Sequence, residues 1–343
     1  MKKVLIFITL VIVFFSVVLI SLEVVVRIFY PQPIFSFFPY SSEQWLDGAN
    51  NTLPKWGIEP STNLGFKVRQ DFFDPRDLPR AKNAFKILVL GDSVTTDALP
   101  PPAYPRLLED LLNSKTNKIL FDVWNFAVPT YNTLQEKELL KESGLKLNPN
   151  MIILGFCLND FAPGMLAIKK EEKIIFFQPD DDIWLRVNPF LFTNSSLYRL
   201  LISRMMQYKI KGLAQESKRL RNEAAKYPHL SERYFNTVYD SISYIKEVSE
   251  SKKIDFLILI FPLMKSYNEY SSYEKDAYNA IVEIAGKLKI PYIDFRPYFE
   301  KRARYDEFRY LFRESDYMHF NNKGHVLVAE VLYKYLVERK LLN

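Results

Sequence analysis

The sequence predicts an α/β protein: a parallel five-stranded sheet covered by helices on both faces, a three-layer α/β/α sandwich, preceded by an N-terminal transmembrane helix. Short apolar runs alternate with amphipathic stretches from residue 83 onwards, which is the pattern of successive strand–helix–strand units. These short runs are apolar at nearly every position, as expected for strands that are buried on both faces. A separate, long and uncharged apolar stretch at the start of the chain accounts for the transmembrane helix.

Length and composition fit one large domain with appendages. The 343 residues are 48% hydrophobic and 15% aromatic, which is enough for a sizeable buried core. Only 10 glycines are present and no segment repeats, which argues against a solenoid or a low-complexity chain. The net charge of +6 is mild, and no base-stacking or zinc motif accompanies it, so we expect no nucleic-acid partner.

The N-terminus has the features of an uncleaved membrane anchor over residues 1–27. The uncharged stretch Val4–Leu22 is, at about 1.5 Å per residue, long enough to cross a bilayer core of about 30 Å. A cleaved signal peptide is the alternative, but it usually ends at an Ala-x-Ala-like site, which Glu23–Arg27 does not provide. Lys2 and Lys3 should keep the N-terminus in the cytoplasm, so we expect the remaining chain on the other side of the membrane.

Residues 28–82 are predicted to form an extended stalk that packs on the domain. Proline is concentrated here, and proline disfavours both helices and central strands. Seven of the chain's 20 prolines lie in this segment: Pro31, Pro33, Pro39, Pro54, Pro60, Pro75 and Pro79. The domain itself is expected to cover residues 83–343.

Within the domain, the chain is predicted to alternate between strand and helix. In the helix expected near 273–288, for example, the apolar residues at helical spacing should face the sheet, namely Ala277, Ile281, Ile284 and Leu288. The apolar runs place strands at 85–90, 119–124, 151–156, 256–261 and 291–294, and the amphipathic stretches place helices near 103–113, 133–143, 233–251, 273–288 and 323–339.

An insert at about 162–232 separates the third predicted strand from the fourth. It is much longer than one crossover helix requires. Part of it is apolar and aromatic and part is basic, so we expect an extra helical layer with a solvated charged face. The alternative is a lid over the site, or a surface that rests on anionic lipid or glycan.

A serine and a distant histidine are the strongest signal of chemistry in the chain. The strand expected at 85–90 leads directly into Gly91-Asp92-Ser93, and Asp316-Tyr317-Met318-His319 lies near the C-terminus. A serine hydroxyl becomes a nucleophile when an imidazole removes its proton, and a carboxylate fixes the tautomer of that imidazole. We therefore predict a catalytic triad of Ser93, His319 and Asp316.

Two further segments complete a known pattern. Asn125–Thr133 follows the second predicted strand, and Gly155–Asp160 follows the third. Together with the segments that contain Ser93 and His319, they resemble the four sequence blocks of the SGNH (GDSL-type) hydrolases, in the same order over about residues 83–343. The resemblance implies the SGNH fold, a flavodoxin-like parallel sheet.

The resemblance also implies an oxyanion hole, which stabilises the tetrahedral intermediate. Its donors would be the backbone N–H groups of Ser93 and Ala127 and the side-chain amide of Asn159. Asp92 and Asp160 are expected to support the site, Asp160 by ordering the surrounding loops.

The chain departs from the family pattern at two positions. Ala127 stands where the family has the glycine of its second block, and Cys157 stands where the third block usually begins with glycine. Alanine keeps the backbone N–H that the oxyanion hole needs. If the backbone at Ala127 had a positive φ, however, alanine would cost about 1 kcal/mol or more.

The remaining candidate residues point to ordinary structural roles. Cys157 is the single cysteine, which excludes an intramolecular disulfide, and it is expected to be a small buried hydrophobe. His325 should pack or cap within the closing helix, and His229 has no visible partner. Asp180–Asp182 fits a loop. We expect no metal and no cofactor.

The function that these features favour is a serine esterase anchored in the bacterial cytoplasmic membrane by a single pass, with its catalytic domain extracytoplasmic. Its substrate would be an acyl ester, for example an acetyl ester, on a cell-envelope glycan or lipid. An O-acyltransferase that modifies an envelope polysaccharide is the alternative, and it would need a membrane protein as acyl donor. A third hypothesis is a catalytically weak binding scaffold, for which Ala127 and Cys157 are the only support.

Overall fold

The computed structural model divides the chain into two compact units, which are described separately. One comprises Met1–Lys67 with Leu166–Leu220, and the other comprises Val68–Met165 with Arg221–Asn343. The residues that the structure describes are 2–29, 59–61, 64–67, 83–96, 102–115, 119–170, 173–177, 191, 194–202, 227–230, 232–263, 265–302 and 318–338.

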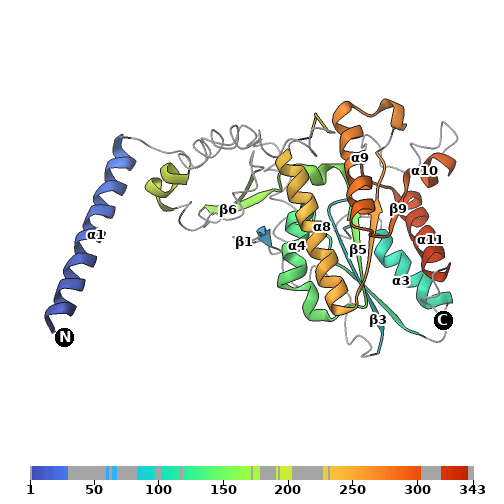
Figure 1. Ribbon diagram of the computed structural model, residues 1–343, viewed down its shortest axis with the longest axis horizontal. Coiled ribbons are helices and arrows are strands. Elements are labelled where there is room, and N and C mark those ends of the chain that lie inside the picture. Colours follow the sequence, from blue (N-terminus) through green and yellow to red (C-terminus); the bar gives the residue numbers. More distant parts are fainter. Residues whose placement is uncertain are drawn as a thin grey trace. The chain divides into compact units, whose positions relative to one another are not determined.

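The second unit is built on a five-stranded sheet of order β4-β3-β5-β8-β9 (Figure 1). Every neighbouring pair is parallel, as predicted. The central strands are apolar and almost completely buried, which explains why their sequences do not alternate between polar and apolar residues. The strands are β3 (Phe85–Gly91), β4 (Phe121–Asn125), β5 (Met151–Phe156), β8 (Asp255–Ile260) and β9 (Tyr292–Asp294).

Helices cover both faces of this sheet, which confirms the predicted three-layer fold. Helices α3 (Tyr104–Lys115) and α11 (Asn322–Glu338) pack against each other on one face. Helices α4 (Thr133–Glu142) and α8 (Glu232–Lys252) pack together on the other (Figure 1).

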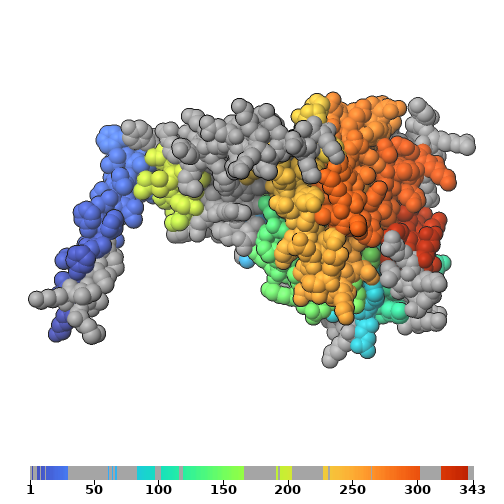
Figure 2. Space-filling model, in the orientation of Figure 1, coloured from blue at the N-terminus to red at the C-terminus, as the bar shows by residue number. Residues whose placement is uncertain are grey.

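The connection from β8 to β9 adds a helix of its own. Helix α9 (Ser272–Lys287) buries Ala277, Ile281 and Ile284 as its spacing predicted, whereas Leu288, just after its last residue, is only partly buried. Figure 2 shows α8 and α9, in orange, as a continuous outer surface of this unit. A short helix that was not predicted, α10 (Arg296–Arg302), follows β9.

The strand register brings the carboxyl ends of β3, β5, β8 and β9 to one level. Gly91 pairs with Gly155, Gly155 with Leu259, and Leu259 with Ile293. The segments that leave these strands therefore start at the same edge of the sheet, which is where open parallel sheets bind their ligands. One of these segments is the 3₁₀ turn η4 (Leu158–Phe161), directly after β5, and another contains the 3₁₀ turn η6 (Tyr267–Glu269), after β8.

The first unit contains helix α1 (Lys2–Phe29) and two antiparallel hairpins. Part of α1, Thr9–Phe29, is long and apolar enough to cross a membrane, a property that a membrane anchor and a signal sequence share. The hairpins pair β1 (Glu59–Ser61) with β2 (Gly65–Lys67) and β6 (Leu166–Lys170) with β7 (Lys173–Phe177).

A carboxylate on α1 caps a second helical segment in this unit. Glu23 accepts hydrogen bonds from the backbone N–H groups of Ser196 (2.8 Å) and Leu197 (2.9 Å), and from the hydroxyl of Ser195 (2.7 Å). These N–H groups start the helical residues 196–202, so Glu23 supplies the acceptor that a helix N-terminus lacks. Arg27 bonds Glu23 at 2.6 Å and donates to the carbonyl oxygen of Asn194 at 2.5 Å.

The hairpin β6–β7 was not predicted, because the expectation for the insert was a helical layer. Most of the predicted stalk at 28–82 and most of the insert at 162–232 lie outside the described residues.

Candidate active site

Ser93 and His319 are 226 positions apart in sequence and meet at the carboxyl edge of the sheet. The distance from His319 Nε2 to Ser93 Oγ is 2.7 Å, and the pair is partly buried. This is the geometry in which an imidazole can remove the hydroxyl proton. Asp316, the predicted third member of the triad, lies outside the described residues.

A tight turn after β3 presents the Ser93 side chain. The carboxylate of Asp92 accepts the N–H of Val94 at 2.9 Å, and the carbonyl oxygen of Asp92 accepts the N–H groups of Thr95 and Thr96. Gly91 makes this turn possible, because a Cβ there would lie 2.6 Å from the Thr95 hydroxyl oxygen.

Asn159 is oriented by a buried carboxylate. Its Nδ2 donates to Asp92 Oδ2 at 3.0 Å, which fixes which end of the amide is the nitrogen. The amide nitrogen has a second N–H that this bond does not use. Asp92 is completely buried, and this burial raises its pKa, while the hydrogen bonds from Asn159 and Val94 lower it. The sequence did not indicate this contact between Asp92 and Asn159.

Ala127 is held beside the Ser93 turn by Asn125. Asn125 Nδ2 donates to the Thr95 carbonyl oxygen at 2.8 Å, and Asn125 Oδ1 accepts the N–H of Ala127 at 3.2 Å. The predicted oxyanion donor at Ala127 is therefore in use in this structure. Ala127 is not among the described non-glycine residues with positive φ, so alanine fits the backbone there without strain. Thr130, three residues later, has a φ of 72°.

Asp160 connects the end of β5 to the start of α4. Its carboxylate accepts the N–H of Cys157 at 2.8 Å and the hydroxyl of Thr133 at 2.9 Å. Helix α4 begins there with a capping box formed by Asn132 and Gln135. Burial raises the pKa of Asp160 well above its usual value, and the nearby charge of Asp92 adds to the effect.

A further carboxyl group, which the sequence analysis did not single out, is buried behind these residues. Glu136 on α4 is 0% exposed, and neither of its carboxyl oxygens has a hydrogen-bond partner within the described part of the chain. Burial raises its pKa well above the usual value, and the charges of Asp160 and Asp92 raise it further. The only sequence signal is its place on the inward face of α4, one turn before Leu140.

The other histidines and the cysteine have structural surroundings. Cys157 is buried, and burial raises the pKa of its thiol well above the usual value, so the sulfur is uncharged. His325 is buried against Tyr104 and Phe320. The expectation that His229 has no partner was wrong, because its Nδ1 lies 3.0 Å from Asp276 Oδ2.

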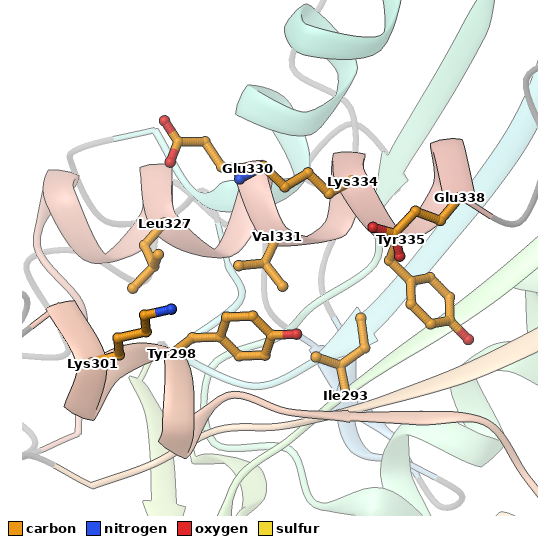
Figure 3. A pocket seen from close by; sticks show the side chains of 9 residues that line it. All are labelled: Ile293, Tyr298, Lys301, Leu327, Glu330, Val331, Lys334, Tyr335 and Glu338. Atoms are coloured by element: carbon orange, nitrogen blue, oxygen red, sulfur yellow. The ribbon is translucent and has the colours of Figure 1, made fainter.

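No group of three or more His, Cys, Asp or Glu side chains suited to a metal ion occurs among the described residues. A cavity of about 510 Å³ lies between α10, α11 and β9, with Tyr298 and Ile293 on one side and Val331 on the other (Figure 3). None of the residues that line it belongs to the site around Ser93.

A family model described as the GDSL-like Lipase/Acylhydrolase family matches residues 89–327. Among curated proteins there is no match. The fold is similar to a lipase/acylhydrolase from Enterococcus faecalis, with 14% identity over 74% of this chain and 96% of that chain and a TM-score of 0.44. It is also similar to an acetylxylan esterase from Geobacillus stearothermophilus, with 12% identity over 74% and 95% of the two chains and a TM-score of 0.47.

Proposed function

The chain belongs to the GDSL-like lipase/acylhydrolase family and is a serine ester hydrolase, and on this premise we propose that Ser93, His319 and Asp316 carry out the hydrolysis of acyl esters on cell-envelope glycans or lipids. The observation that carries the proposal is the 2.7 Å distance between Ser93 Oγ and His319 Nε2. The other two histidines have different surroundings: His325 packs on aromatic rings and His229 bonds to Asp276.

In the proposed reaction, Ser93 Oγ attacks the ester carbonyl carbon while His319 Nε2 takes the hydroxyl proton. His319 then gives this proton to the leaving alcohol oxygen, and an acyl-serine remains. Water, deprotonated by His319, attacks the acyl carbon and releases the acid, which returns Ser93 to its starting state. Asp316 would orient the imidazole and stabilise its protonated form.

The tetrahedral oxyanion would be held by three donors: the N–H of Ser93, the N–H of Ala127 and the unused N–H of Asn159. The contact with Asp92 supports this assignment for Asn159, because it orders the amide and leaves one of its two N–H groups unused by that bond. The Ala127 N–H would be shared with Asn125 Oδ1, since that bond is already long at 3.2 Å. Each such donor contributes about 3–4 kcal/mol in comparable sites.

We propose further that α1 stays attached and anchors the protein in the bacterial cytoplasmic membrane, with the catalytic unit extracytoplasmic. Retention is supported by the contacts of Glu23 and Arg27, which bond to residues 194–197 far along the chain. A cleaved signal sequence would leave those helix N–H groups without their acceptor. The basic residues Lys2 and Lys3 support a cytoplasmic N-terminus.

Labelling with a fluorophosphonate probe tests the assignment of Ser93. The full-length protein should be labelled, Ser93→Ala should not be, and His319→Ala should be labelled far more slowly because the hydroxyl keeps its proton. His229→Ala, which removes the histidine that lies against Asp276, is the matched control and should be labelled like the wild type. Equal labelling of the wild type and Ser93→Ala would refute the esterase assignment of Ser93 and favour the binding-scaffold hypothesis. Labelled protein that releases acyl groups only when a sugar acceptor is present would be an O-acyltransferase.

Two measurements test the anchor. Protease added to intact spheroplasts should digest the catalytic unit, and complete protection would reverse the proposed topology. An affinity tag placed before Lys2 should remain on the mature membrane protein, because α1 is not removed. Recovery of untagged, soluble protein would show a cleaved signal sequence instead.

A further inference from the structure

An arginine at the active-site edge of the sheet has no hydrogen-bond acceptor for its side chain among the residues that the structure describes. Arg296 is the second residue after β9, whose last residue is Asp294. In the sheet register, Asp294 pairs with Ile260, and Ile260 pairs with Phe156. Phe156 is one residue beyond the pair Gly91–Gly155. Arg296 therefore leaves the sheet at the same edge as Ser93.

Two tyrosines and a carboxylate hold the guanidinium in place. Arg296 Cζ lies 4.7 Å from the ring centre of Tyr267 and 4.6 Å from that of Tyr278, distances at which a cation is attracted to a ring face. The Tyr278 hydroxyl donates to Asp294, and Asp294 accepts the backbone N–H of Arg296 at 3.0 Å. The Tyr267 hydroxyl donates to Asn279 at 3.1 Å. The side chain is thus ordered before any ligand arrives.

Arginine has five N–H donors, and within the described part of the chain none of those on Arg296 is hydrogen-bonded. The nearest carboxylate oxygen, Asp294 Oδ2, lies 3.6 Å from Nη2, too far for a hydrogen bond. The Nε of Arg296 is buried without a hydrogen-bond partner among the described residues, and buried donors normally have one, whereas the side chain as a whole is 25% exposed. An ordered, partly exposed guanidinium that has no acceptor in the described part of the chain points to a ligand that supplies one.

This arginine lies along the edge of the sheet from the nucleophile. Three strand spacings separate β3 from β9, or about 14 Å. Helix α9, which carries Tyr278, also contacts the η4 turn that contains Asn159. A ligand that reaches both Ser93 and Arg296 must therefore be a chain of several units rather than a single small ester.

We propose that Arg296, Tyr267 and Asp294 form a subsite for a distant sugar unit of a glycan whose acyl ester lies at Ser93. Sugar oxygens would accept hydrogen bonds from the guanidinium, Asp294 would accept one from a sugar hydroxyl, and the edge of the Tyr267 ring would contact the sugar ring. A fatty acyl chain would offer this arginine no acceptor, so the subsite favours a glycan over a lipid. The inference rests on the proposed esterase activity of Ser93.

Steady-state kinetics with esters of different length test this subsite. The probes are p-nitrophenyl acetate, chemically O-acetylated xylose and chemically O-acetylated xylohexaose, with an O-acetylated hexagalacturonate as an anionic counterpart. Of the two hexasaccharides, consider the one that the wild type hydrolyses with the lower KM. Arg296→Gln should raise this KM by about tenfold, which is the effect of losing one charge-assisted hydrogen bond. The constants for p-nitrophenyl acetate and for acetylated xylose should not change. Lys334→Gln, on α11, is the matched control and should behave like the wild type with every probe.

The outcomes separate failure of the subsite from failure of the esterase. If the wild type does not hydrolyse p-nitrophenyl acetate, the proposed function itself is refuted. If it does, but Arg296→Gln keeps the wild-type KM for both hexasaccharides, the subsite is refuted. An equal loss with short and long esters would also refute it, because that pattern indicates a structural role. Should Arg296→Gln not fold, Arg296→Lys keeps the charge beside Asp294 while losing the planar donors, and the same selective rise in KM is expected.

Discussion

Replacing Gly155 by alanine should damage both the stability of the protein and the site. A Cβ at this position in β5 would lie 2.5 Å from the Thr95 hydroxyl oxygen, 2.9 Å from the Tyr104 hydroxyl oxygen and 3.0 Å from the Phe261 ring. All three neighbours are buried and cannot move into solvent. Thr95 and Tyr104 also share a hydrogen bond of 3.3 Å that the new methyl group would break.

The expected cost follows from these contacts. Forcing a methyl group into a packed core costs about 1–3 kcal/mol, and losing one buried hydrogen bond costs about 1 kcal/mol more. For a domain of this size, a total of about 2–4 kcal/mol corresponds to a melting temperature lower by about 5–15 °C. Thr95 also holds Asn125, which holds Ala127, so kcat should fall as well.

Gly286→Ala is the matched control for this variant. Gly286 lies in α9, is exposed, and has no atom within 4 Å of the position that a Cβ would take. Alanine should stabilise the helix there by about 0.5–1 kcal/mol. The assay is thermal unfolding of the full-length protein in detergent, followed by circular dichroism. A Gly155→Ala protein that melts at or above the wild-type temperature, while Gly286→Ala behaves as expected, would refute the packing argument.

Three further predictions concern residues around Ser93. Glu136→Gln should raise the melting temperature, and the gain should be larger at pH 8 than at pH 5. The reason is that Glu136 keeps its proton in the folded protein, whereas the unfolded chain releases it above about pH 4.5, so the stability of the wild type falls as pH rises. A gain that does not depend on pH would contradict this. Asn159→Ala should lower kcat by about 10²–10³ through loss of an oxyanion donor, while a cooperative thermal transition, a few degrees lower because buried Asp92 loses a hydrogen bond, shows that the fold is intact. Ala127→Gly should change kcat/KM only modestly, since the backbone there is unstrained, and a gain above about a hundredfold would show that alanine impairs the site.

The sequence alone was sufficient for the order of strands and helices in the second unit. Buried parallel strands must be apolar along their whole length, so runs such as Ile87–Leu90 are visible without any knowledge of their neighbours. The predicted boundaries differ from the observed ones by one or two residues at most strands, because terminal residues are chosen by hydrogen bonding rather than by hydrophobicity. The hairpin β6–β7 was missed because the sequence between its strands, Glu171-Glu172, has none of the glycine, proline or asparagine signals of a hairpin.

The pairing of Ser93 with His319, which lie 2.7 Å apart in the structure, could be predicted from the sequence because each residue lies in a short motif with recognisable neighbours. The contacts that orient the site were not, since each joins residues that are distant in the chain and close only in the folded sheet. Asn159 reaches Asp92 over 67 positions, and Asp160 reaches Thr133 over 27. His229 and Asp276, 47 positions apart, are a third example.

Burial was the other property that only the tertiary structure decided. Glu136 and Arg296 look like surface charges in the sequence, because a charged residue is rarely enclosed. The packing of α4 near η4 encloses Glu136 beside Asp160 and Asp92, and the tyrosines of η6 and α9 enclose most of Arg296. The hydrophobic pattern of the sequence determines which face of each helix packs on the sheet. Which charged side chains become buried along with that face depends on how the helices pack against the sheet and against one another.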